Sequence, residues 1–580
     1  MDQVTDPRRS LAACTGTMSP STLDLFIFTF NCAKNLINVA VFASHLQAAL
    51  SQNATGLPDL VVFSLQEVAP LSYSFIGSYF LGPYYSRYEE ALNLAATEIL
   101  AGSGAQGGGG DDEGLSTPQT AAGGWGRGPA PTPAPYTLVR TKNVGMTAIM
   151  LFARTPAAVH HIEEAECGFG TADMGNKGAV GLRVTWSDGK SAGGDDDGGD
   201  EFATTELTFV ATHLAAMEWN LKKRNANWRT IVSGLTFENP KTAIPGVFPA
   251  NATLPDADRP DSAAEEAGAE EEDGDNDDDD ARPLLSRGSS SESGGGGAPF
   301  HPEHPDLTAE HHVTLHEMSV FKPTSHLFVA GDLNYRIGAK TPPALSAFPS
   351  FEPDSPDHWS TFLGRDQLTR ERVAGRTLHG LAEADISFGP SYKYDVLGDA
   401  DGAVNEVAAR TRGEVPWKWA PHRWPSWCDR VLYLDVPPWA RRRREQEQAG
   451  KGGGGGGVVV QAYDLMPVVA TSDHRPVFLR VQVPVLGPAD MAPPRVVVAG
   501  AGEEEEEGAD GETLLFEEDL ADPRAVLPVP IDVHAWERRA AARRREIVVG
   551  WSMFLWSTRE GAVLMATAVA VGVGGWWAWR

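Results

Sequence analysis

The sequence has 580 residues, with 78 Asp and Glu against 48 Lys and Arg, which gives a formal net charge of −30. A balance this acidic argues against a protein that binds nucleic acid through a positive surface. The four cysteines lie far apart with no C-x-x-C pair, so neither a zinc site nor a disulfide framework is indicated.

Several segments rich in Gly, Pro or acidic residues bury too little apolar surface to fold. We expect disordered insertions at about 101–135, 188–201, 240–305 and 449–457. They interrupt one large domain at 22–485, which follows an N-terminal tail at 1–21. A partly acidic linker at 486–545 and a C-terminal unit at 546–580 are expected to complete the chain.

Within the large domain, apolar runs alternate with segments of helical spacing. The expected strands are Leu23–Phe30, Leu60–Leu65, Met146–Ala153, Ala179–Trp186, Leu207–Thr212, His326–Ala330, Arg430–Leu434 and Val477–Val483. The expected helices are Val39–Leu50, Met217–Ser233, Arg365–Thr369 and Ala374–Leu378. Many strands with few helices favour an α/β fold, a four-layered sandwich of two stacked mixed sheets flanked by helices.

Polar residues stand at the ends of several of these strands, where layered sheet proteins place their active sites. A single strand-end carboxylate is usually a turn or cap residue. Here seven polar residues occur together: Asn31, Glu67, His213, Asp332, Asn334, Asp473 and His474. Carboxylate and amide oxygens suit a hard cation such as Mg²⁺, and imidazoles suit phosphate charge, so the set predicts magnesium-dependent phosphate chemistry.

Short motifs around these residues follow one another between about Leu23 and Val483: F-N-C-A-K-N, L-Q-E, G-N-K-G-A-V, H-L-A-A, G-D-L-N-Y-R-I, S-Y-K-Y-D, P-S-W-C-D-R-V-L and S-D-H-R-P-V. The ordered set resembles the signature of the inositol polyphosphate 5-phosphatases of the endonuclease/exonuclease/phosphatase superfamily. G-D-L-N-Y-R-I followed by W-C-D-R is its most specific part. With its apolar C-terminal segment, the chain is most similar to the tail-anchored 5-phosphatases of the fungal endoplasmic reticulum.

The resemblance implies a role for each strand-end residue. Glu67 would bind Mg²⁺, with Asn31 close by and Asp473 on the other side of the metal. Asp332 would activate the attacking water, which Asn334 would hold in line.

The imidazoles and a glycine-rich turn would contact the phosphate and the substrate. By the resemblance, His213 and His474 would touch the phosphoryl oxygens, and Asp429 would orient His213 through its second ring nitrogen. The G-N-K-G-A-V turn exposes backbone N–H groups that can bind anions, with Asn176 and Lys177 beside them. In the family, this region faces the lipid-linked side of the inositol ring.

Three more residues match family positions that hold the ring 4-phosphate: Tyr392, Lys393 and Arg423. The arginine suits this task because its planar fork of donors matches a phosphate. One position departs from the family pattern, since Pro421 stands where a lysine is common. We therefore expect recognition of the 4-phosphate that is weaker or differently built.

The segment 561–579 contains no charged residue and would span about 28 Å as a helix, close to the hydrocarbon thickness of a bilayer. The basic run from Arg538 to Arg545 precedes it, which the positive-inside rule places in the cytosol. A buried core helix is the alternative. We expect one transmembrane helix in the endoplasmic reticulum or a connected membrane, with the catalytic domain facing the cytosol.

The sequence thus predicts Mg²⁺-dependent hydrolysis of the 5-phosphate of phosphatidylinositol 4,5-bisphosphate, with no nucleic-acid partner. Three alternatives remain: a phosphatase for soluble inositol phosphates, a nuclease or sphingomyelinase on the same fold, and an inactive membrane adaptor. The set of Tyr392, Lys393 and Arg423 argues against a nuclease, and the intact catalytic set argues against an adaptor.

Overall fold

The computed structural model describes residues 21–105, 133–191, 202–245, 247, 307–397, 415–447, 456–494 and 516–580. The N-terminal tail and most of the predicted insertions lie outside these residues. Described edges of the insertions are folded: one helix continues to Ala105, one strand continues to Ser191, and a short helix forms at Pro240–Ala243 with Ile244 buried beside it.

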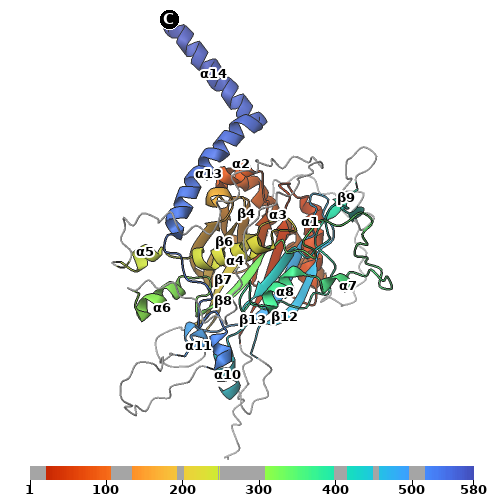
Figure 1. Cartoon of the computed structure of the whole chain (residues 1–580), viewed down its shortest axis with the longest axis vertical. Coiled ribbons are helices and arrows are strands. Elements are labelled where there is room, and N and C mark those ends of the chain that lie inside the picture. Colours follow the sequence, from red (N-terminus) through yellow and green to blue (C-terminus); the bar gives the residue numbers. More distant parts are fainter. Residues whose placement is uncertain are drawn as a thin grey trace, which may run out of the picture.

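Two mixed sheets face each other in the centre of the molecule (Figure 1). The first has the strand order β12 (Val459–Leu465), β13 (Val477–Pro484), β1 (Thr22–Asn31), β2 (Leu60–Gln66), β4 (Thr147–Ala153) and β3 (Thr137–Val144). The second has the order β11 (Asp429–Tyr433), β8 (Ser325–Asp332), β7 (Phe202–His213), β6 (Gly178–Ser191) and β5 (Val159–Gly168). A separate two-stranded sheet pairs β9 (Tyr394–Val396) with β10 (Trp417–Trp419).

Helices lie outside the sheets. Those before the C-terminal region are α1 (Val39–Ser51), α2 (Leu71–Ile76), α3 (Ser78–Ala105), α4 (Leu221–Gly234), α5 (Pro240–Ala243), α6 (Ala309–Glu317), α7 (Ser360–Leu363), α8 (Gln367–Val373), α10 (Pro438–Glu447), α11 (Pro488–Met491) and α12 (Glu517–Leu520). The predicted helix at Ala374–Leu378 is a turn, because α8 ends before Gly375, whose φ of +66° breaks the helix.

The alternation of side chains along β1 explains the layers. Phe26, Phe28 and Phe30 belong to the core shared with α1 and α3, whereas Leu25 and Ile27 point into the core between the two sheets. A third core lies between the second sheet and α4. Apolar residues on both faces of a strand require cover on both sides, so the four-layered sandwich predicted from the sequence is confirmed.

The C-terminal region differs from the predicted linker and anchor. Helix α13 (Ala535–Ser557) runs through the expected boundary at 545/546 and packs against α2 and β5. Part of the expected linker is also packed, since Arg524 is buried and Asp519 pairs with Arg442 of α10. Helix α14 (Arg559–Trp579) then extends away from the domain (Figure 1). Within the described part of the chain, it is the one helix long and apolar enough to cross a membrane.

Candidate active site

The strand register places three polar residues side by side. Strands β7 and β8 run parallel and end with His213 opposite Asp332, while β11 runs antiparallel to β8 and begins with Asp429 opposite Asp332. The strands approach closely at Gly331, where a Cβ atom would lie 1.9 Å from the Thr212 carbonyl oxygen. The glycine of the G-D-L-N motif is therefore required by this backbone contact.

Asp332 is the centre of the site and is 1% exposed. Its Oδ2 lies 3.0 Å from Nδ2 of Asn31, which ends β1 in the facing sheet, and 3.2 Å from Nε2 of His213. Its Oδ1 accepts the backbone N–H of Asn334 at 3.1 Å. Burial alone would raise the pKa of this carboxyl group, but the charge of His474 and the hydrogen bond from His213 lower it below its ordinary value. Asp332 is thus held ionised where the two sheets meet.

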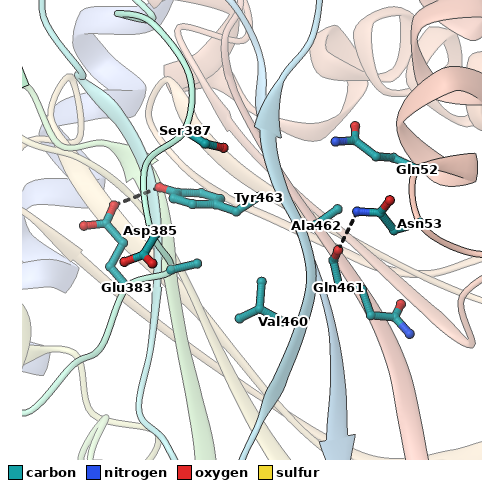
Figure 2. Close-up of a pocket in the computed structure, with 10 residues that line it drawn as sticks. Gln52, Asn53, Glu383, Asp385, Ser387, Val460, Gln461, Ala462 and Tyr463 are labelled. Carbon is teal, nitrogen blue, oxygen red and sulfur yellow. Dashed lines mark hydrogen bonds between the residues drawn. The ribbon is translucent and has the colours of Figure 1, made fainter. Parts of the chain in front are cut away.

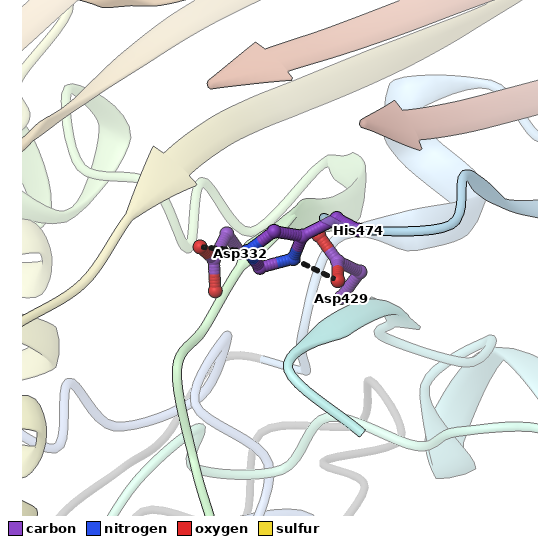
Figure 3. A group of neighbouring side chains, drawn as sticks. All are labelled: Asp332, Asp429 and His474. Atoms are coloured by element: carbon purple, nitrogen blue, oxygen red, sulfur yellow. Dashed lines mark hydrogen bonds and ion pairs between the residues drawn. The ribbon is translucent and has the colours of Figure 1, made fainter. Parts of the chain in front are cut away.

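Asp429 and His474 form a second buried pair (Figure 3). Oδ2 of Asp429 lies 2.8 Å from Nδ1 of His474 and accepts the hydroxyl of Ser391 at 2.7 Å. Nε2 of His474 lies 3.9 Å from Oδ2 of Asp332. This corrects the prediction that Asp429 orients His213. Because β8 lies between β7 and β11, Asp332 separates the two residues, and Asp429 orients His474 instead.

The charges in this cluster follow from burial and from the neighbours of each group. Burial disfavours the cation of His474, but Asp429 and Asp332 outweigh it and raise the pKa to about 9. Burial also raises the pKa of Asp429 to about 6. For His213, burial and the nearby cation Lys177 lower the pKa. The site therefore combines a cationic His474 with a neutral His213 around the Asp332 carboxylate.

Lys177 and Glu67 complete the inner site. Nζ of Lys177 lies 2.6 Å from Nε2 of His213 and 3.8 Å from Oε1 of Glu67, and Nζ of Lys34 lies 3.7 Å from Oε2 of Glu67. Burial would raise the pKa of Glu67, but nearby cations, Lys177 before Lys34, lower it. The sequence placed Lys177 with the substrate groups, and the structure puts it in contact with the catalytic histidine candidate.

A metal ion could be held by the carboxylate oxygens of Glu67 and Asp332, which suit a hard divalent cation. Asn31 presents its Nδ2 to Asp332, while its Oδ1 accepts the N–H of Ala33. Asp332, Asp429 and His474 also place possible ligand atoms within 4.8 Å of one another. A histidine that is cationic and bonded to Asp429 is a poor ligand, so this trio is better suited to orientation and charge. The third predicted metal ligand, Asp473, is 33% exposed at its side chain and pairs with Nζ of Lys393 at 3.7 Å.

Arg336 belongs to the site although the sequence reasoning gave it no role. It is 3% exposed, donates to Oδ1 of Asn334 at 2.5 Å and lies 4.3 Å from the ring centre of Tyr392. The Tyr392 ring in turn packs against the His474 ring at 4.5 Å. Arg336 occurs within the G-D-L-N-Y-R-I motif, so the motif was the signal that could have identified it.

The remaining substrate candidates lie on adjoining segments. The N–H of Ala420 donates to the carbonyl of Lys393, and the N–H of Arg423 donates to the carbonyl of Ala420. Nη2 of Arg423 lies 3.4 Å from Sδ of Met217, in the loop that follows β7. Asn176 stands beside Lys177, and its Oδ1 is buried without a hydrogen-bond partner among the described residues.

A pocket elsewhere in the molecule is distinct from this cluster (Figure 2). It lies beside β12, where Tyr463 donates to Glu383 and Asn53 donates to the carbonyl of Gln461. None of its lining residues is a predicted site residue.

Taken together, two facing mixed sheets with buried carboxylates and imidazoles at their strand ends define an α/β sandwich protein with a charged site where the sheets meet. The chain belongs to the endonuclease/exonuclease/phosphatase family 2, whose model matches residues 28–480.

Its relatives include named phosphatases. Type I inositol polyphosphate 5-phosphatase 5 of Arabidopsis thaliana is 38% identical over 103 residues, which cover 18% of this chain and 16% of that protein. Phosphatidylinositol 3,4,5-trisphosphate 5-phosphatase 1 of Mus musculus is 30% identical over 154 residues, which cover 27% of this chain and 11% of that protein. The chain therefore matches only a small part of the length of these relatives.

Among solved structures, the inositol polyphosphate 5-phosphatase domain of SPsynaptojanin, in complex with inositol (1,4)-bisphosphate and calcium ion, is similar with a TM-score of 0.43 and 18% identity. The similarity covers 80% of this chain and 85% of that one.

Proposed function

We propose that this chain hydrolyses the 5-phosphate of inositol phosphates, with phosphatidylinositol 4,5-bisphosphate as its lipid substrate. The observation that carries the proposal is the convergence of Asn31, His213 and His474 on the Asp332 carboxylate, where the two sheets meet. Phosphate monoesters resist attack because their oxygens are negative, so catalysis requires positive charge and a held nucleophile. This cluster supplies both.

Asp332 is the candidate base. Its lowered pKa keeps it ionised at neutral pH, so one oxygen can accept a hydrogen bond from the attacking water. It takes the proton of the water as the new P–O bond forms and the P–O bond to the ring oxygen breaks, and the departing ring oxygen takes a proton from solvent water. His474 is held by Asp429 and supplies a positive charge next to the reacting phosphoryl group. Lys177 supplies a second positive charge, next to Nε2 of His213. Asn334, held by Arg336 and by the carbonyl of Leu214, would align the water.

Glu67 would hold Mg²⁺, with Asn31 close by and Asp473 on the other side of the metal, the set predicted from the sequence. The Asp332 carboxylate lies next to Asn31. Bound Mg²⁺ would offset phosphate charge and lower the pKa of a bound water. Two ammonium groups lie 3.7 and 3.8 Å from Glu67 and keep this carboxylate ionised, which is the form that binds a metal ion.

The substrate preference rests on the resemblance together with the position of the cationic side chains. Lys393 and Arg423 lie on segments joined by backbone hydrogen bonds. Tyr392, which precedes Lys393, packs its ring against the ring of His474. Two cations near the reacting centre suit a ring that carries a second phosphate.

We further propose that α14 anchors the enzyme in the endoplasmic reticulum or a connected membrane, with the catalytic domain in the cytosol. The helix has 21 residues, and its apolar side chains are largely exposed, as expected of a segment that lipid covers.

Phosphate release from a panel of lipid and soluble inositol phosphates, with and without Mg²⁺, tests this function. We expect release only from substrates with a 5-phosphate, only with Mg²⁺, and faster from the lipid in vesicles. Turnover of soluble substrates alone would favour the soluble-phosphate alternative. No release from any inositol phosphate would overturn the proposal.

A further inference from the structure

A buried carboxylate on the C-terminal helix reaches into the glycine-rich turn of the site. Glu546 of α13 is fully buried, and its Oε1 accepts the backbone N–H of Gly175 at 2.8 Å. The same carboxylate is bonded to Arg539 at 2.5 and 2.9 Å and to Arg543 at 3.3 Å. A buried carboxylate with all of its oxygens paired is held in one position.

The contact holds Gly175 from one side while the β3–β4 turn holds it from the other. The carbonyl of Gly175 accepts the N–H of Met146 at 3.2 Å. A Cβ atom on Gly145, whose φ is +49°, would lie 1.9 Å from that carbonyl oxygen. The peptide groups of Gly175 are therefore fixed between the first sheet and α13, with no room for a larger residue on the sheet side.

The turn carries Lys177 two residues further on. Since Nζ of Lys177 lies 2.6 Å from His213 and 3.8 Å from Glu67, a shift of the turn moves a charge at the centre of the site. Arg545 adds a second contact from α13, because it donates to the carbonyl of Ala172 in the same loop at 3.2 Å.

Helix α13 is itself fixed to the domain on both sides of Glu546. Arg543 donates to the carbonyl of Phe75 at 2.7 Å, and a Cβ atom on Gly550 would lie 2.9 Å from the Cβ of Phe75. Phe554 is 3% exposed and packs against Phe80 at 5.1 Å. Towards the start of the helix, Arg539 pairs with Glu166 of β5 at 3.0 Å.

We propose that Glu546 is a positioning residue, which fixes the 170–177 loop so that Lys177 meets the substrate phosphate, and that α13 is thereby part of the substrate site. This inference rests on the proposed phosphatase function. Because α13 leads directly into α14, the element proposed to bind the membrane also shapes the loop that binds the substrate.

The test compares Glu546→Ala with the matched control Glu537→Ala, an exposed glutamate of the same helix that pairs with Lys241. With a soluble inositol phosphate, Glu546→Ala should raise KM about fivefold or more, as for a lost buried hydrogen bond to a charged group, while kcat changes less. Glu537→Ala should match the wild type. Glu546→Gln keeps an oxygen for the Gly175 N–H and should recover part of the lost affinity.

A double-mutant cycle separates positioning from a general loss of structure. If Glu546 acts through Lys177, then Glu546→Ala should raise KM by less than about twofold in a Lys177→Ala background, because coupled residues are non-additive. Equal effects in both backgrounds would overturn the proposal.

Amide hydrogen exchange on the unmutated chain keeps the test independent of how the variants fold. The Gly175 N–H should exchange at least about a hundredfold more slowly than an unstructured amide, since a buried carboxylate accepts it. Fast exchange there would overturn the positioning role. If the wild type releases phosphate but Glu546→Ala equals Glu537→Ala, the positioning role fails and the phosphatase stands; a wild type without any activity would remove the proposed function itself.

Discussion

The strand-end site and helix α13 both contain buried charges, but they satisfy them differently. In the site, Oδ1 of Asp429, Nη1 of Arg336 and Oδ1 of Asn176 are buried and lack hydrogen-bond partners among the described residues. In α13, every oxygen of Glu546 is paired, and Arg539 bonds two carboxylates. Unpaired buried polar atoms cost free energy and persist where a substrate or ion completes them, whereas fully paired ones hold a structure together.

Because of this contrast, we expect mutations in the two regions to have different effects on turnover and on stability. A change in the site that preserves the shape of the side chain should remove turnover with little effect on folding, because the packing around it is kept. A change in α13 should first alter the stability and the shape of the neighbouring loop. Helix α14 forms a third case. Its residues are almost all exposed, so changes in them should alter neither turnover nor the stability of the domain.

Asp332→Asn should have the largest effect. It keeps the shape of the side chain but removes the proposed base, so we expect kcat to fall at least about a hundredfold. The temperature of unfolding should stay close to that of the wild type. Rates on a soluble inositol phosphate, measured with thermal unfolding on the same samples, check both statements. A variant that kept more than about a tenth of the rate would remove Asp332 from its role.

Activity should also require Mg²⁺ and vanish in a chelator. Glu67→Gln should raise the Mg²⁺ concentration needed for half-maximal rate, because an amide binds a hard cation less well than a carboxylate does. Glu537→Gln is the control, since Glu537 lies on α13 and pairs with Lys241. Titration of Mg²⁺ for the three proteins gives the comparison. Full activity in the chelator would contradict a metal-dependent reaction.

The inner site could be read from the sequence because each of its residues follows or begins an apolar run. Asn31, His213 and Asp332 are strand-end residues, and the strands are strong enough in pattern to be predicted. The sequence could not show which histidine is hydrogen-bonded to Asp429, because that depends on the order of β7, β8 and β11 in the sheet. Pairing between strands distant in sequence leaves no local signal.

The fold was predicted best where burial is most complete. The edge strands β3, β5 and β12 were missed because they mix polar and apolar residues. The basic run from Arg538 to Arg545 was interpreted as the cytosolic flank of an anchor. Two of its residues also have partners in the protein: Arg539 pairs with Glu546, and Arg543 donates to the carbonyl of Phe75. The spacing of residues in a sequence does not distinguish a charged side chain that faces solvent from one that has a buried partner.

Two truncations distinguish α13 from α14. Removing 559–580 should release the protein from membranes and leave its rate on a soluble inositol phosphate unchanged. Removing 546–580, the C-terminal unit expected from the sequence, also removes Glu546 and about half of α13, so we expect a KM several-fold higher. Fractionation and soluble assays on both variants decide the matter. Equal kinetics would mean that α13 has no part in the site, and a soluble full-length chain would contradict the anchor.

The smallest expected effect is the pH dependence of the α13 contact. Burial would raise the pKa of Glu546, but the hydrogen bonds from Arg539 and Gly175 lower it below the ordinary glutamate value. Besides Arg539 and Arg543, one more charged group faces this carboxylate: Glu166 of β5, which also pairs with Arg539.

A carboxyl group with a lowered pKa stabilises the fold above its unfolded pKa of about 4.3 and loses that contribution as pH falls through the folded value. The free energy of unfolding of the wild type should therefore exceed that of Glu546→Gln most at neutral pH, and the difference should shrink as pH falls below about 4. Denaturant unfolding of both proteins between neutral and acidic pH measures it. A difference that stayed constant with pH would show that the charge of Glu546 contributes nothing and that its oxygen alone holds the turn.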